Sequence, residues 1–203
     1  MIMSSIGTLE RYAELFRKEL SEHDPLQQVV LKGHLVIEAA LDNIIATVFF
    51  HPEYVFRARI GFAQKVALAR AYGLRKADNS MWNLILSINE ARNEVAHNLA
   101  GERRSNKLEQ LRRIFMSEVT DEMQEKFMGD GIDVDKADDQ TIVALACFLC
   151  AGFLGSYEDD VATLRRFIDT LDHGINPERE RVPVNTPQEA KAKPKKTKSS
   201  GGT

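Results

Sequence analysis

GHLVIEAALDNII, residues 33–45, is the stretch that decides the fold of this chain. Its apolar residues recur at helical spacing, and the pattern extends to a long helix of roughly residues 25–50. Asp24-Pro25 predicts the start, because Asp is a frequent N-cap residue and Pro fits the first helical position. His51-Pro52 predicts the end. Since apolar residues cover most of its faces, we expect this helix at the centre of a helical bundle.

One polar stripe interrupts the apolar surface of this predicted helix. His34, Glu38 and Asp42 are spaced four apart, which places them on one side of the helix. Polar groups at the centre of a bundle need partners. Arg92 is the predicted partner of Glu38 or Asp42, and Asn93 would add a hydrogen bond. The stripe could equally face solvent or form a purely structural ion pair, and spacing alone leaves these alternatives open.

Helical periodicity recurs along the rest of the chain, whereas strand patterns are nearly absent. Further helices are predicted over about residues 8–22, 59–72, 107–116, 120–127 and 138–172, and another runs from a cap at Asp78 or Ser80 past His97 to Gly101. Gly73 predicts a left-handed cap, Asp78 or Ser80 an N-cap, and Gly101 and Gly174 helix ends. The predicted fold class is therefore all-α, a helical bundle of about five to seven helices.

The composition changes sharply after Pro177. The segment PERERVPVNTPQEAKAKPKKTKSSGGT contains five lysines, at positions 191, 193, 195, 196 and 198, and almost no large apolar residue. Burial cannot offset its ordering entropy, so we expect a helical domain over residues 1–176 and a disordered basic tail over 177–203. The lysines would serve either as an electrostatic contact for RNA or as a solubilising terminus.

The overall composition limits the classes of function. With a net charge of -3, the chain is not a uniformly basic nucleic-acid binder. The N-terminus lacks the pattern of a signal peptide, and the apolar run of residues 142–154 is too short to span a bilayer, so we expect a cytoplasmic protein with no membrane partner. Cys147 and Cys150 are interpreted as buried core thiols, with redox chemistry or zinc as the alternatives. No cofactor and no metal site are predicted.

The segment RNEVAH, residues 92–97, has the groups needed to cut RNA without a metal. Arg92 can neutralise a phosphate, Asn93 can orient it, and His97 can transfer protons near neutral pH. In a straight helix Arg92 and His97 point roughly 140° apart, whereas Asn93 and His97 share a face. Because the reaction benefits from one base and one acid, a two-fold homodimer would supply a second histidine.

These residues resemble the motif of the HEPN superfamily (higher eukaryotes and prokaryotes nucleotide-binding domain), helical bundles with an arginine four to six residues before a histidine. The resemblance covers Arg92, Asn93 and His97, and the layout of a long early helix followed by a motif late in a subsequent helix. It implies a metal-independent endoribonuclease that acts as a dimer, of the kind found in toxin–antitoxin and phage-defence systems. Arg92 would stabilise the scissile phosphate, His97 would act as base or acid, Asn93 would orient them, and an antitoxin or regulatory protein is an implied partner.

Positive charge follows the motif directly. Arg103, Arg104 and Lys107 are the candidate RNA-binding residues, and a solvated charged face is the alternative. A second function class also fits the helical layout: a non-enzymatic module that binds protein or nucleic acid, similar to regulators resembling the mannitol operon repressor. The two classes differ at Arg92, since a nuclease needs it open to a cleft and a scaffold can bury it against Glu38 or Asp42.

Overall fold

The computed structural model describes residues 24–73, 77–97, 102–120 and 133–181, together with Glu14, Pro187 and Lys191. At residue 97 and residues 102–105 the description covers the backbone alone. Within these ranges the chain forms six helices and no strand, which confirms the all-α prediction. The predicted helices over residues 8–22 and 120–127 lie outside the described residues, apart from the helical Glu14 and the non-helical Thr120, as does most of the predicted tail.

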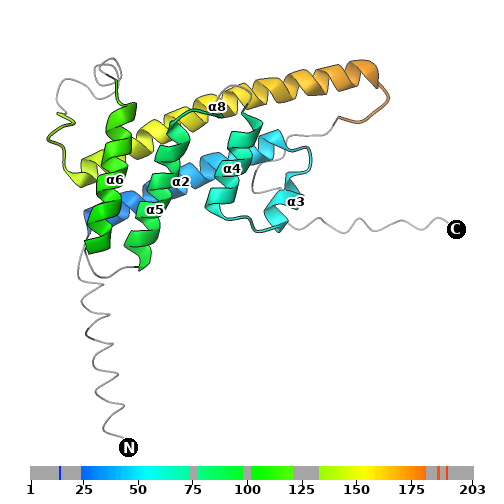
Figure 1. Cartoon of the computed structure of the whole chain (residues 1–203). Helices are drawn as coiled ribbons and strands as arrows, with labels where there is room; N and C mark the ends of the chain where they lie inside the picture. The colour runs from blue at the N-terminus through cyan, green and yellow to red at the C-terminus, as the bar shows by residue number, and fades with distance from the viewer. Residues whose placement is uncertain are drawn as a thin grey trace, which may run out of the picture.

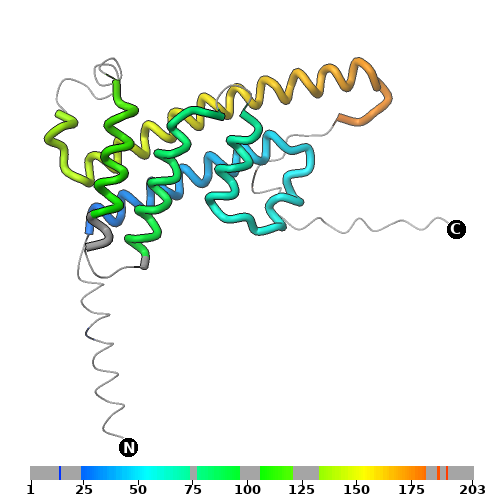
Figure 2. The backbone as a smooth tube through the Cα atoms, in the orientation of Figure 1, coloured from blue at the N-terminus to red at the C-terminus, as the bar shows by residue number. Residues whose placement is uncertain are grey.

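The two longest helices of the bundle are α2, Pro25–Val48, and α8, Asp139–Ile175. They pack more extensively on each other than any other pair, and Figure 2 shows them running alongside one another. The shorter helices α3 (Pro52–Arg57), α4 (Phe62–Tyr72), α5 (Met81–His97) and α6 (Glu102–Glu118) complete the described fold. In Figure 1, α4, α5 and α6 lie across this pair, so that α2 is the central helix, as predicted.

Side-chain caps account for where the helices begin. Asp24 Oδ1 accepts from the backbone N–H of Gln27 at 3.1 Å, and Asp138 Oδ1 accepts from that of Thr141 at 2.8 Å, so both long helices start where the sequence predicts. At the start of α5, Ser80 occupies the predicted N-cap position, and its carbonyl accepts from Leu84 N at 3.4 Å. The side-chain hydrogen bond there comes from Asn79 instead, whose Oδ1 accepts from Met81 N at 2.8 Å.

The segment between α2 and α4 departs from the predictions. α2 ends at Val48, just before the predicted stop at His51-Pro52, but Pro52 then begins α3, a helix that the sequence did not predict. Proline fits a first helical position as well as it terminates a preceding helix. Arg59, predicted as the start of the next helix, has a φ of 52° and follows the end of α3, so α4 begins only at Phe62. Gly73 ends α4 with a φ of -68°, and the predicted left-handed cap is therefore wrong.

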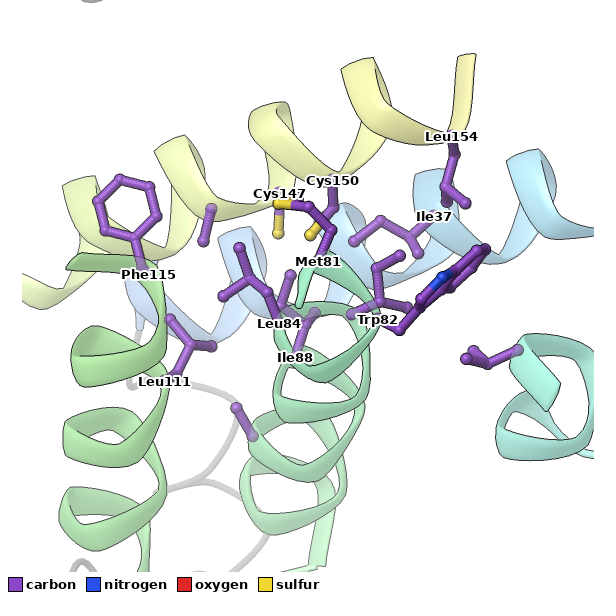
Figure 3. Close-up of a cluster of buried hydrophobic side chains, with 14 of the residues drawn as sticks. Ile37, Met81, Trp82, Leu84, Ile88, Leu111, Phe115, Cys147, Cys150 and Leu154 are labelled. Carbon is purple, nitrogen blue, oxygen red and sulfur yellow. The ribbon is translucent and has the colours of Figure 1, made fainter. Parts of the chain in front are cut away.

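Trp82 is the centre of the hydrophobic core. It is fully buried, and the rings of Phe153 and Tyr157 on α8 meet it edge-on at 5.1 and 5.8 Å. The Tyr157 hydroxyl donates to Ala69 O at 2.7 Å, which ties α8 to α4. Figure 3 shows part of this core between α2, α5, α6 and α8. The largest fully buried side chains are those of Trp82, Phe115, Ile37, Leu41, Ile44, Ile45, Leu84, Ile85, Ile88, Leu111, Ile142 and Leu154.

By length and composition α8 could cross a membrane, but this is weak evidence because its apolar side chains also form the core against α2. The helix extends beyond the predicted end at Asp172, through Gly174, and its last residue is Ile175. Large apolar side chains remain exposed along its second half, a feature considered further below.

Candidate functional site

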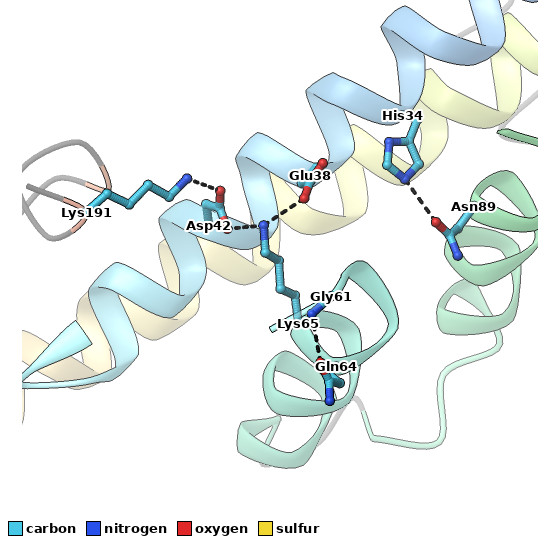
Figure 4. A network of polar contacts seen from close by, with 8 residues as sticks. All are labelled: His34, Glu38, Asp42, Gly61, Gln64, Lys65, Asn89 and Lys191. Atoms are coloured by element: carbon cyan, nitrogen blue, oxygen red, sulfur yellow. Dashed lines mark hydrogen bonds and ion pairs between the residues drawn. The ribbon is translucent and has the colours of Figure 1, made fainter. Parts of the chain in front are cut away.

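The predicted polar stripe of α2 is real and mostly buried. His34 and Asp42 are each 5% exposed, while Glu38 is about one-third exposed at its side chain. Figure 4 shows all three on the side of α2 that faces α4 and α5. The solvent-facing alternative is therefore wrong for His34 and Asp42. Buried polar groups of this kind require partners, and the partners determine what the stripe can do.

Lys65 of α4 is the cation that pairs with this stripe. Its Nζ lies 2.8 Å from Glu38 Oε1 and 2.8 Å from Asp42 Oδ1, and the Lys65 side chain is itself buried. Burial alone would lower the pKa of Lys65, but the hydrogen bonds and charges of Asp42 and Glu38 outweigh it and raise the pKa above 10.5. The predicted pairing of Arg92 with Glu38 or Asp42 is wrong, because Lys65 pairs with both carboxylates and Arg92 bonds to Asn93 instead.

Lys191, in the predicted tail, adds a second positive charge to Asp42. Its Nζ lies 2.5 Å from Asp42 Oδ2 and 5.1 Å from the ring centroid of Phe56 on α3. Asp42 therefore lies between two lysines, one from α4 and one that is 149 residues away in the chain. Glu38 and Asp42, the second and third residues of the stripe, thus form a structural cluster in which two carboxylates are balanced by Lys65 and Lys191.

A cleft of about 470 Å³ opens beside His34 and Glu38, where α2, α4 and α5 meet. Two of the three predicted catalytic residues, Arg92 and Asn93, line it together with His34 and Glu38. The half-buried Arg92 hydrogen-bonds through Nη1 to Asn93 Oδ1 at 3.1 Å. The remaining lining residues are Gly61, Phe62, Ala63, Gln64 and Asn89. The cleft thus offers a guanidinium, an imidazole and several amides to a ligand.

His34 is held in one orientation within this cleft. Its Nε2 lies 3.1 Å from Asn89 Oδ1 on α5, and the Phe62 ring of α4 lies 4.4 Å away, centroid to centroid. Burial lowers the pKa of His34 below 6.5, and the positive charges of Arg92 and Lys65 act in the same direction. The hydrogen bond to Asn89 and the charge of Glu38 oppose this shift without overcoming it. The imidazole is therefore neutral at neutral pH.

The other predicted site residues lie at the far end of α5 and the start of α6. His97 is the last residue of α5, four positions after Asn93, and its side chain lies outside the described part of the structure. The same holds for the side chains of Arg103 and Arg104 in the first turn of α6. Lys107 Nζ lies 2.7 Å from Glu90 Oε2, so its charge is already paired within the protein.

Sequence reasoning missed Lys65 and Asn89. Lys65 occurs in FAQKVALARAY, where a single lysine among apolar residues carries little signal. Asn89 had a usable signal, because it precedes Asn93 by four residues and His97 by eight and so belongs to one side of α5.

The two cysteines are buried in the core, as predicted. Burial raises the pKa of the Cys147 thiol to about 12 and that of Cys150 well above its ordinary value, which makes both thiols unreactive at neutral pH. Among the described residues, no group of three or more His, Cys, Asp or Glu side chains is arranged to hold a metal ion.

No protein-family model, curated protein or solved structure matches this chain. The function is therefore inferred from the cleft and from the RNEVAH motif that borders it.

Proposed function

We propose that this protein is a metal-independent endoribonuclease of HEPN type that acts as a homodimer. It cuts RNA by attack of the 2′-hydroxyl on the adjacent phosphate, in the cleft between α2, α4 and α5. The proposed setting is the cytoplasm, where the enzyme serves as a toxin or phage-defence effector under the control of an antitoxin or regulatory protein. The resemblance of RNEVAH to the superfamily motif supports this proposal alongside the cleft.

The position of Arg92 is the observation that carries the proposal. A scaffold would use this arginine to neutralise Glu38 or Asp42, but Lys65 already does so at 2.8 Å from each. Arg92 instead lines the cleft and bonds to Asn93, a neutral amide. A half-buried guanidinium paired only with an amide, among the described residues, keeps its charge available for a phosphate.

Each motif residue has a role in the proposed reaction. Arg92 binds the scissile phosphate and stabilises the charge that develops on its oxygens. Asn93 orients Arg92 through the hydrogen bond of 3.1 Å. His97 transfers a proton as base or acid, and Arg103 and Arg104 extend the RNA-binding surface beyond the end of α5.

A binding module without catalysis is the second candidate function. The contact between Lys107 and Glu90 favours it, because this ion pair removes one of the three positive charges expected to hold RNA. In this candidate the cleft would bind a polar ligand through the same arginine and amides, with no proton transfer. A regulator similar to the mannitol operon repressor would belong to this class.

RNA cleavage by the purified protein in excess EDTA tests the proposal. We expect the wild type to leave 2′,3′-cyclic phosphate ends, and Arg92→Ala to lower the rate by about 10²–10³-fold through loss of charge stabilisation. His97→Ala is expected to lower it by about 10²–10⁴-fold. Arg166→Ala is the matched control, since this arginine is exposed on α8 and should leave the rate unchanged.

Two results would contradict the proposal. Cleavage that EDTA abolishes would remove the metal-independent mechanism. Absence of cleavage by folded wild type on varied RNAs would favour the binding module instead.

A further inference from the structure

His34 lies in the cleft but outside the RNEVAH motif, and its hydrogen bond determines its tautomer. An amide oxygen only accepts hydrogen bonds, so Asn89 Oδ1, 3.1 Å away, requires the proton of the neutral ring on Nε2. The lone pair is then on Nδ1. Contact with the Phe62 ring at 4.4 Å limits rotation of the imidazole. The neutral ring can therefore accept a proton at Nδ1.

Burial, helped by two nearby cations, keeps His34 neutral until it accepts that proton. Glu38 approaches from its own helix, Lys65 from α4 and Arg92 from α5. Burial together with the two cations outweighs the carboxylate and the amide, so the net pKa falls below 6.5. A neutral imidazole at pH 7 is the form that a general base requires.

The position of His34 complements that of His97. Asn89, Asn93 and His97 follow one another at intervals of four on α5, and His34 binds the first of them. An eight-residue separation corresponds to roughly 12 Å along a helix, so the backbone of Asn93 lies midway between those of Asn89 and His97. Arg92, beside Asn93, lies between them along the helix axis. A phosphate bound by Arg92 would therefore lie in the cleft that His34 also lines.

We propose that His34 is the general base of RNA cleavage, acting in the same chain as the Arg92 that binds the phosphate; this inference rests on the proposed function. As His34 Nδ1 takes the proton of the 2′-hydroxyl, O2′ forms a bond to phosphorus. The bond from phosphorus to O5′ breaks, and O5′ receives a proton from His97. The products are a 2′,3′-cyclic phosphate and a 5′-hydroxyl.

The test is the pH dependence of kcat in EDTA for the wild type, His34→Gln and Asn89→Ala. We expect the wild-type kcat to rise with pH as His34 loses its proton, and this rise forms the acid limb of the pH profile. His34→Gln should lose about 10²–10⁴-fold in kcat and should also lose this acid limb. Asn89→Ala should move the limb to lower pH, because the hydrogen bond that it removes raises the pKa of His34. If His34 had only a structural role, the acid limb of the pH profile would stay where it is in both variants.

Each contrary outcome has a distinct meaning. A folded His34→Gln protein with wild-type kcat and an unchanged acid limb would overturn the role of His34 while leaving the ribonuclease in place. If His34→Gln fails to fold, an unmoved limb in Asn89→Ala overturns it. Absence of cleavage by the wild type overturns the proposed function and this inference together.

Discussion

At the scale of single residues, Lys65 decides which part of the site is structural. It neutralises two carboxylates in a buried position, and removing one partner of a buried ion pair leaves an uncompensated charge. We expect Lys65→Met to lower the free energy of unfolding by about 3 kcal/mol, measured by chemical denaturation. Lys136→Met is the matched control, because Lys136 pairs with Asp133 at the surface and should cost less than about 1 kcal/mol. Equal costs for both variants would show that the buried cluster is dispensable.

At the scale of elements, the close approach of α2 and α8 depends on Gly33. A Cβ atom at this position would overlap Cys147 Sγ on α8, closer than van der Waals contact permits. Gly33→Ala should therefore destabilise the protein by about 1–3 kcal/mol despite the better helix propensity of alanine. Cys147→Ala in the same chain should recover part of this loss, since it removes the overlapping sulfur.

Gly152, on α8, is the matched control for that element. A Cβ atom there meets nothing within 4 Å, so Gly152→Ala should stabilise by up to about 1 kcal/mol through helix propensity alone. If Gly33→Ala is as stable as Gly152→Ala, the two long helices are not in the close contact described.

At the scale of the whole molecule, the second half of α8 carries an exposed apolar stripe of Leu164, Phe167, Leu171 and Ile175. Figure 1 shows this end of α8 extending past the other helices. Contiguous apolar surface of this kind marks an interaction site, and a second copy of the same helix would bury it. We expect light scattering at micromolar concentration to give twice the 22.9 kDa of one chain.

Phe167→Glu should shift that mass to a single chain, because a charge in the stripe opposes burial. Phe148→Glu is the matched control, since Phe148 is 63% exposed against 65% for Phe167 but lies in the first half of α8. A single-chain mass for the wild type, or dissociation by Phe148→Glu alone, would exclude this stripe as the contact between copies.

The sequence by itself determined the helices and what lies on each of them. Caps at Asp24 and Asp138, periodic apolar residues and the four-residue spacing of His34, Glu38 and Asp42 are local properties, readable from neighbours within about two helical turns. The same reasoning placed RNEVAH at the end of α5. It did not predict α3, and it failed at Arg59 and Gly73, whose φ angles of 52° and -68° are the reverse of the helical and left-handed conformations expected there.

Only the tertiary structure decided which side chains meet. Lys65 rather than Arg92 reaches Glu38, across 27 residues, and Asn89 reaches His34 across 55. These pairings follow from how α4 and α5 pack on α2, and helix packing is determined by the combined shape of many apolar side chains. No local pattern encodes that shape. Only the packed structure therefore shows that Arg92 lines the cleft without a carboxylate partner, among the described residues, and that His34 lines the same cleft.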